Sequence, residues 1–192
     1  DYTVYRDKFL EKRNVLSNDR QYPEKLLNLI KNAPENIVEY KAMSILLEAG
    51  IKTQKSILVQ SENEAIQAAK TIGKAVALKV QSQDIPHKSQ AGGVVLNIAS
   101  HNDVGQHFKS MKSAISQDFL IAIIDGFLIQ EMSEPGLEII LGINNREGFG
   151  PILMVGFGGI NVEKTRDVAF APVPLGKDDC NHLLKKLKGS VL

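Results

Sequence analysis

The hydrophobic pattern of residues 37–80 alternates between helical and strand spacing, and this feature constrains the fold most strongly. Apolar side chains recur at helical spacing over Val38–Ala49, and a strand is predicted over Ser56–Gln60. A second helix is predicted from Ser61 to Gly73, and a second strand at Val76–Val80. Alternating helices and strands predict a layered α/β or α+β domain and argue against a helical bundle.

Strand patterns dominate the second half of the chain. A helix that begins at Ser100 comes first, and turns that contain glycine and proline separate the strands after it. We therefore expect an α+β fold in which a mixed or antiparallel sheet is flanked by helices. The remaining expected elements are strands at 94–99, 127–132, 137–143, 151–157 and 167–173 and helices at 22–31 and 177–187.

The balance of charges argues against two classes of partner. Lys and Arg number 23 against 22 Asp and Glu, so the net charge of +1 favours neither a nucleic-acid surface nor an acidic membrane. The single cysteine, Cys180, cannot form an internal disulfide, and no apolar run has the length of a membrane span. We expect a reduced, cytoplasmic protein with no nucleic-acid or membrane partner.

One lysine interrupts the strand at Val76–Val80. The period-two rule places the three large apolar residues of this strand on one face and Lys79 on the other. The loop that follows ends in Gly92 and Gly93, which allow backbone N–H groups to approach a ligand. Because an ammonium group suits phosphate oxygens, Lys79 and this loop are predicted to form a phosphate site. The alternative is a lysine that pairs with a carboxylate at a sheet edge.

The same loop carries His87, which is followed by Lys88 and Ser89. A neutral imidazole is a nitrogen nucleophile near neutral pH, so His87 beside an anion pocket could accept a phosphoryl group. The alternative is a solvated loop histidine. No two histidines are four residues apart, and the sequence has no CxxC or HExxH motif, so we predict no histidine-based metal site.

Two glutamates, Glu131 and Glu138, lie on consecutive predicted strands. The turn residues 134–136 between them predict a tight hairpin, in which both carboxylates lie near the open end. There they could accept hydrogen bonds from an amino group or a ribose diol. The alternative is a pair of solvated strand carboxylates.

Three segments, taken together, resemble one known family. They are ALKVQSQDIPHKSQAGGVVL from Ala77, FLIQEMSEPGLEIILGI from Phe127 and FGPILMVGFGGINVEKTRDVAFAPVPL from Phe149. In this order they resemble the ATP-grasp domain of NDP-forming acyl-CoA synthetases, the family of ADP-forming acetyl-CoA synthetase. The resemblance covers residues 37–175, which is most of the chain.

The resemblance implies roles for the residues of the predicted phosphate site. Lys79 would contact the phosphates of ATP or ADP, and Gly92 and Gly93 would belong to the loop that closes over them. His87 would exchange a phosphoryl group with ATP, and a histidine on the CoA-ligase part of the enzyme would carry it to the acyl group. His87 and Ser89 both lie in the matching DIxHKS motif.

The resemblance also implies partners that the chain does not contain. Glu131 would lie at the hinge beside the nucleotide base, adenine or guanine, and Glu138 would bind the ribose hydroxyls. The family holds Mg²⁺ through a later E-x-D-x-N-P pattern, which does not occur before Leu192. CoA would be bound by separate CoA-binding and ligase domains, or by an alpha subunit of the same enzyme.

These expectations give a domain plan. Residues 1–36 would form a linker or docking arm, residues 37–175 the small nucleotide-binding lobe, and residues 176–192 the start of a truncated C-terminal segment. A chain that starts at Asp1 and stops after a helical pattern suggests a fragment, which we expect to be inactive alone as a ligase.

Three other functions remain open at this point. A related domain in some bacterial proteins lies beside an acetyltransferase and regulates it. The chain could also be a nucleotide-binding module without catalysis. A plain structural domain is the last alternative, and it requires Lys79 and His87 to point away from each other.

Overall fold

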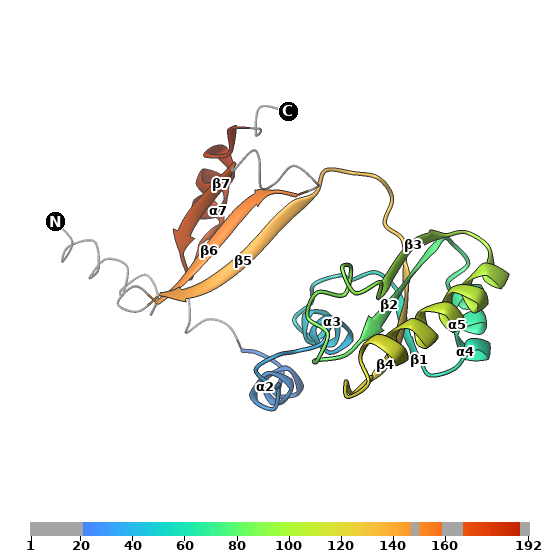
Figure 1. The fold of residues 1–192 in the computed structure, drawn as a ribbon. Helices are drawn as coiled ribbons and strands as arrows, with labels where there is room; N and C mark the ends of the chain where they lie inside the picture. Colours follow the sequence, from blue (N-terminus) through green and yellow to red (C-terminus); the bar gives the residue numbers. More distant parts are fainter. Residues whose placement is uncertain (1–20, 147–149, 159–166, 189–192) are drawn as a thin grey trace. The chain divides into compact units, whose positions relative to one another are not determined.

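The computed structural model describes residues 21–146, 150–158 and 167–188 of the chain (Figure 1). The chain divides into two compact units, of which one spans Tyr22–Glu134 and the other is built from Pro135 onward. Antiparallel sheets flanked by helices form both units, which confirms the predicted α+β class. Residues 1–20 of the arm predicted for residues 1–36, and residues 159–166, lie outside the described residues.

The first unit contains a four-stranded sheet in the order β1-β4-β2-β3. All neighbouring strands in it are antiparallel. β4 pairs with β1 on one side and with β2 on the other, so the last strand of the unit lies inside the sheet. The strands are β1 (Ser56–Val59), β2 (Val76–Gln81), β3 (Val94–Ile98) and β4 (Gly126–Glu131).

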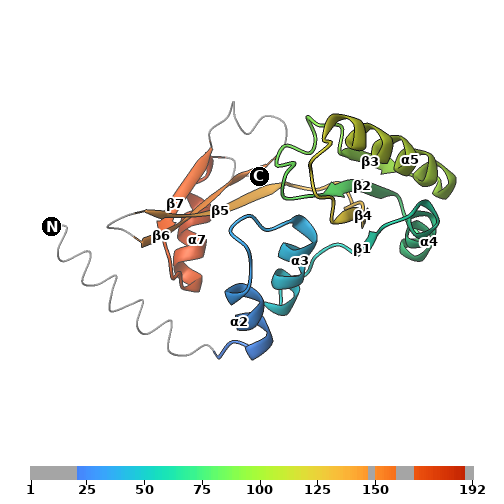
Figure 2. The same ribbon diagram turned by 60° about the horizontal axis from the view of Figure 1, so that its bottom comes forward.

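Helices cover both faces of this sheet. α4 and α5 pack side by side on one face, and α3 lies on the other (Figure 2). On the α3 side, the sulfur of Met43 accepts hydrogen bonds from Ser56 Oγ and Gln130 Nε2. The helices are α2 (Glu24–Lys31), α3 (Glu39–Glu48), α4 (Glu62–Ile72) and α5 (His101–Asp118).

Apolar faces of α4 and α5 form the core of the first unit together with the sheet. The stripe predicted over Val38–Ala49 is only partly correct, because Leu46 and Ala49 are exposed and α3 turns Met43 toward the sheet instead. The large apolar residues of α5 are all buried, and they pack with α4 and the sheet. None of the helices within residues 21–146, 150–158 and 167–188 combines the length and the hydrophobicity that a membrane span requires. The buried α5 residues are Val104, Gly105, Phe108, Met111 and Ile115.

Local hydrogen bonds fix the start of α4. Ser61 Oγ accepts a hydrogen bond from the backbone N–H of Glu64 at 3.3 Å, as the serine-to-glutamate spacing predicts. The carboxylate of Glu64 accepts in return from the backbone N–H of Gln60 at 2.7 Å. This bond is the main cause that lowers the pKa of Glu64 below its ordinary value. Two backbone donors at the helix start are thus satisfied by side chains.

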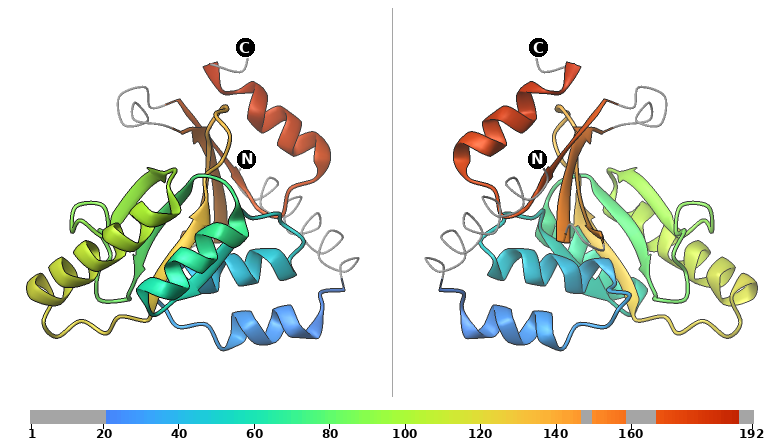
Figure 3. Two further views of the ribbon diagram at one scale, coloured as in Figure 1. Left: turned by 90° about the vertical axis from the view of Figure 1, so that its right-hand side faces the viewer. Right: turned by 90° about the vertical axis from the view of Figure 1, so that its left-hand side faces the viewer.

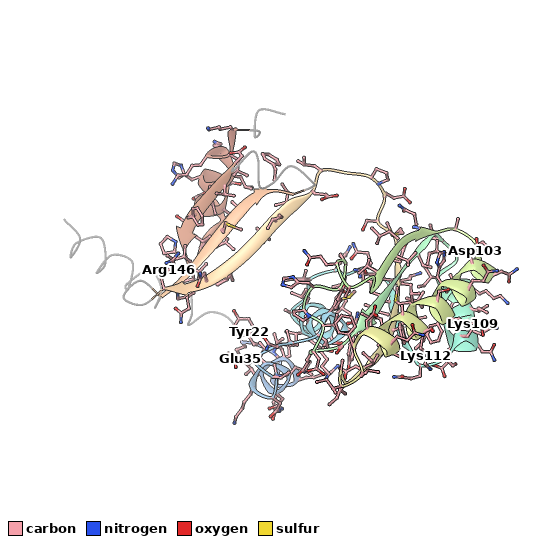
Figure 4. All side chains as sticks on the ribbon, in the orientation of Figure 1. Tyr22, Glu35, Asp103, Lys109, Lys112 and Arg146 are labelled. Atoms are coloured by element: carbon pink, nitrogen blue, oxygen red, sulfur yellow. The ribbon has the colours of Figure 1, made fainter. Side chains whose placement is uncertain are left out.

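The second unit is a three-stranded antiparallel sheet in the order β5-β6-β7. α7 covers one face of it (Figure 3), where Val155 and Ala169 pack with Leu183 and Leu187. The other face has a hollow of about 400 Å³, and Arg146 at the end of β5 (Figure 4) contributes to its lining. The elements are β5 (Ile139–Arg146), β6 (Gly150–Phe157), β7 (Val168–Pro172) and α7 (Lys177–Lys185).

The predicted hairpin between the strands that carry Glu131 and Glu138 is wrong. β4 pairs with β1 and β2, whereas β5 pairs with β6 in a different sheet. The physical reason is that both edges of β4 are already occupied, through Ser56↔Gln130 and Val76↔Glu131, so β4 has no free edge for β5. The two glutamates therefore belong to different units of the chain.

The burial of Ile85 yields a test of the fold. Ile85→Ala should lower the free energy of unfolding by about 2–5 kcal/mol, because the side chain is 1% exposed within the core of the first unit. The matched variant Ile121→Ala should change it by less than about 0.5 kcal/mol, because Ile121 is 97% exposed. Urea denaturation followed by circular dichroism measures both, and equal losses would contradict this account of the core.

Candidate functional site

Lys79 is the least buried residue of β2. The other residues of this strand are buried, whereas the Lys79 side chain retains 20% of its exposure. Val76, Leu78 and Val80 pack into the core, so the predicted face alternation is confirmed. Since β2 lies between β4 and β3, Lys79 projects from a central strand and not from a sheet edge. Its pairing with the carboxylate of Glu39 agrees with the other part of the alternative.

The loop after β2 is anchored by its first residues. Ile85 is buried in the core, and Ser82 Oγ donates to the carbonyl of Ile123 at 2.7 Å. The carboxylate of Asp84 accepts from the backbone N–H of Ile123 at 2.7 Å. These contacts hold the chain two residues before His87, which is itself exposed.

Lys79 and the loop surround one hollow of about 590 Å³. His87, Lys88 and Ser89 line it together with Lys79 and Glu39. The sequence prediction that a strand lysine and this loop come together agrees with this geometry. Because Lys79 and His87 line the same hollow, the condition for the plain structural alternative is not met.

Two ammonium groups in the hollow share one carboxylate. Lys79 Nζ lies 2.6 Å from Oε1 of Glu39, and Lys88 Nζ lies 3.6 Å from Oε2. The Lys88 side chain is 18% exposed, so both cations are partly withdrawn from water but accessible. Two lysines that already converge on one carboxylate are suited to bind the oxygens of a phosphate group.

The glycine pair that ends the loop has two different roles. Gly92 has a φ of +68°, which other residues rarely adopt, and nothing lies within 4 Å of the position of a Cβ there. At Gly93 a Cβ would lie 2.5 Å from the Val80 side chain, so this glycine allows the loop to pack on β2. The backbone N–H of Gly93 donates to the carbonyl of Lys88 at 2.7 Å and thereby closes the loop on itself.

Glu131 lies on the other face of the sheet from Lys79. Its register partner Val76 belongs to the face that packs against α4 and α5, whereas Lys79 pairs with Leu128 on the α3 side. Lys74 Nζ lies 2.8 Å from the Glu131 carboxylate. This hydrogen bond is the main cause that lowers the pKa of Glu131 and raises that of Lys74.

Glu138 belongs to the second unit, where it directly precedes β5. Its side chain is exposed, and its backbone carbonyl accepts a hydrogen bond from Gly158 N–H at 2.6 Å. The contacts described for Glu131 and for Glu138 are therefore each made within one unit. Within the part of the chain that the structure describes, no group of three or more His, Cys, Asp or Glu side chains could hold a metal ion.

Sequence reasoning missed Glu39, Ser82 and Asp84. Glu39 is the first residue of α3, and an acidic residue in a first helical turn is commonly there for the helix dipole. Its spacing of 40 residues from Lys79 gave no pattern that could pair the two. Asp84 is the first residue of the DIxHKS motif and Ser82 lies two residues before it, and a serine or aspartate in a turn suggests only a local hydrogen bond.

This geometry defines an α+β domain in which a sheet lysine and a histidine-bearing loop line one hollow. Comparison with known proteins gives the family: the model of the ATP-grasp domain matches residues 28–192. The chain belongs to the ATP-grasp domain family.

Two curated relatives illustrate the similarity. Acetate–CoA ligase (ADP-forming) II of Archaeoglobus fulgidus is 37% identical over 153 residues, which cover 80% of this chain and 22% of that protein. The beta subunit of acetate–CoA ligase (ADP-forming) II of Pyrococcus furiosus is 34% identical over 152 residues, which cover 79% of this chain and 64% of the subunit. The chain thus spans less than two thirds of the length of either relative.

Solved structures agree with this family. Acetyl-coenzyme A synthetase 1 of Candidatus Korarchaeum cryptofilum, described as dinucleotide forming and in complex with coenzyme A and Ca-AMPCP, superposes with a TM-score of 0.80. It is 33% identical, and the match covers 89% of this chain and 75% of that chain. In another structure of that protein, bound to coenzyme A and Mg-AMPPCP, the phosphohistidine segment points towards the nucleotide binding site.

The Lys74–Glu131 pair yields a direct test of the geometry. Lys74→Met should raise the pKa of Glu131 toward its ordinary value, because it removes the cation that stabilises the carboxylate. Carbon-13 NMR titration of the Glu131 carboxyl measures the change. Because the folded-state pKa is lowered, the pair favours the folded state above the ordinary carboxyl pKa, and this contribution is lost as pH falls through the lowered value.

A matched control for this titration is Lys109→Met. Lys109 forms an ion pair with Glu62 at 3.0 Å between α5 and α4, and it contacts neither Lys74 nor Glu131 in the described pairs. This variant should leave the Glu131 titration unchanged. A Glu131 pKa that does not respond to Lys74→Met would contradict the placement of the carboxylate beside Lys74.

Proposed function

We propose that this chain supplies the nucleotide-binding and phosphohistidine-forming part of an NDP-forming acyl-CoA synthetase. The complete enzyme would convert an acid, CoA and NTP into acyl-CoA, NDP and phosphate, reversibly. The observation that carries the proposal is the hollow in which Lys79, Lys88 and His87 meet. Curated relatives that match this chain include ADP-forming acetate–CoA and 4-hydroxybutyrate–CoA ligases, which supports the same reaction class over a regulatory domain.

The chain's own residues would act on a phosphoryl group. An imidazole nitrogen of His87 would form a bond to the γ-phosphorus of NTP while the bond from that phosphorus to the β-phosphate oxygen breaks, which releases NDP. Lys79 and Lys88 would neutralise the phosphate oxygens on either side of this transfer. Reversal of the same step would return the phosphoryl group from His87 to NDP.

Further steps would require partner domains. His87 is exposed on a loop, so a second histidine on a CoA-ligase domain or alpha subunit could approach it and take the phosphoryl group. That histidine would pass it to the carboxylate of the acid, and the thiol of CoA would displace phosphate from the acyl phosphate. Glu138 and the hinge that follows β4 would contact the nucleoside. Glu131 would contribute through its backbone carbonyl, because its N–H donates to the carbonyl of Lys55 and its carboxylate is paired with Lys74.

Mg²⁺ would neutralise phosphate charge in such a reaction. At phosphate sites it is usually held by one or two carboxylates together with substrate phosphates and water. Among the described residues no group of three or more His, Cys, Asp or Glu side chains forms a preformed cage for it. We therefore assign no magnesium ligand within them. The ligands would come from a later segment of the complete protein.

Phosphate labelling of the complete protein tests the proposed function. Incubation with Mg²⁺ and γ-phosphate-labelled ATP should give protein-bound label that is labile to acid and stable to base, as expected of phosphohistidine. His87→Ala should abolish it, because no nitrogen remains at this position to accept the phosphoryl group. His107→Ala, which changes an exposed histidine on α5, is the matched control and should label like the unmodified protein.

Two outcomes would contradict the proposal. Label that persists unchanged in His87→Ala would place the acceptor elsewhere. ATP binding by the unmodified protein without any label would instead favour a regulatory or purely nucleotide-binding domain.

A further inference from the structure

The phosphate site already contains an anion that belongs to the protein. The two carboxylate oxygens of Glu39 face different lysines, with Oε1 2.6 Å from Lys79 Nζ and Oε2 3.6 Å from Lys88 Nζ. Glu39 also lines the hollow shared with His87 and Ser89. A single carboxylate therefore lies between the two cations that are available for phosphate oxygens.

The charges of this cluster make an entering phosphate compete with the Glu39 carboxylate for the two lysines. Two ammonium groups and one carboxylate leave one net positive charge, so a phosphate that enters meets lysines that are already paired. Charge-assisted hydrogen bonds of this kind are about twice as strong as neutral ones. A ligand must either displace the Glu39 carboxylate or share both lysines with it.

Glu39 can leave the lysines without loss of the helix that carries it. The next residue, Tyr40, donates its backbone N–H to Gln81 Oε1 at 3.3 Å and its hydroxyl to Asp125 at 3.3 Å. Lys41 lies 3.6 Å from the same aspartate. Buried Val38 and Met43 hold the start of α3 against the sheet as well. These contacts fix the helix independently of the Glu39 side chain.

We propose that Glu39 is a positioning residue that competes with phosphate for Lys79 and Lys88. In the free protein its carboxylate holds both ammonium groups toward the hollow and offsets their mutual repulsion. When a phosphate-bearing ligand binds, the lysine ammonium groups pair with the phosphate oxygens instead of the carboxylate. When the ligand leaves, they pair with the Glu39 carboxylate again. Glu39 thus weakens phosphate binding and favours release of the nucleotide product. The ligand class, a nucleotide phosphate, rests on the proposed function.

Pyrophosphate binding to the complete protein, measured by isothermal titration calorimetry, tests this competition. Glu39→Gln should bind pyrophosphate roughly three- to thirtyfold more tightly than the unmodified protein, a range typical of coupling between adjacent charges. Glu39→Asp retains the charge and should remain close to the unmodified protein. Lys79→Met combined with Glu39→Gln should lose the gain, because the competition acts through this lysine.

The matched control is Glu62→Gln. Glu62 pairs with Lys109 at 3.0 Å between α4 and α5 (Lys109 is labelled in Figure 4), across the sheet from α3. This variant removes the same charge outside the hollow and should leave pyrophosphate affinity unchanged. A role of Glu39 in stability alone would lower the melting temperature of Glu39→Gln without tighter binding.

Four results would overturn the proposal. Three of them are unchanged or weaker binding by Glu39→Gln, an equal gain in Glu62→Gln, and a gain that survives Lys79→Met. Absence of measurable pyrophosphate binding by both the unmodified protein and Glu39→Gln would overturn it too. Because pyrophosphate needs neither a nucleoside contact nor the His87 imidazole, these results are independent of the labelling assay, which alone decides the proposed function.

Discussion

The ion pair between Lys79 and Glu39 is the interaction on which the site depends. β2 is a central strand that is buried on both faces, and a lysine placed there must find an anion or pay a desolvation penalty. Glu39 provides that anion from the first turn of α3, and Lys88 joins it from the loop. The strand, the helix and the loop are therefore connected by one carboxylate. His87 precedes Lys88 on this loop and lines the same hollow as the cluster.

The central position of β4 determines where one unit ends and the next begins. Its two edges are occupied by β1 and β2, so β4 cannot pair with the strand that follows it in the chain. β5 pairs instead with β6 in a second sheet. A pattern of consecutive strands separated by a turn normally indicates a hairpin, and sequence alone cannot tell whether the first strand still has a free edge. This is why the predicted pairing of Glu131 with Glu138 failed.

The sequence predicted local helices and strands well, but it predicted poorly which distant residues individual side chains contact. The period of the apolar residues located α5 and the face of β2 that carries Lys79, and the spacing of Ser61 and Glu64 located the start of α4. These properties depend on neighbours within a few residues. The direction of Glu131 depends instead on register with Val76 on another strand, and the pairing of Glu39 depends on a contact 40 residues away. Neither is encoded in a local pattern.

Neighbouring residues of the histidine loop differ in burial, and this difference fits the proposed reaction. Ile85 is buried in the core, and the Asp84 carboxylate accepts a hydrogen bond from the backbone N–H of Ile123. His87, two residues after Ile85, is exposed. A phosphoryl acceptor that must meet first a nucleotide and then a second protein group needs both properties. It must be anchored to remain near the lysines, and it must be accessible to reach its partner. A histidine in the packed core would be positioned but unreachable, and one on an unanchored loop would be reachable but unpositioned. The short anchored span between Ile85 and Lys88 meets both requirements, which a purely structural domain would not need.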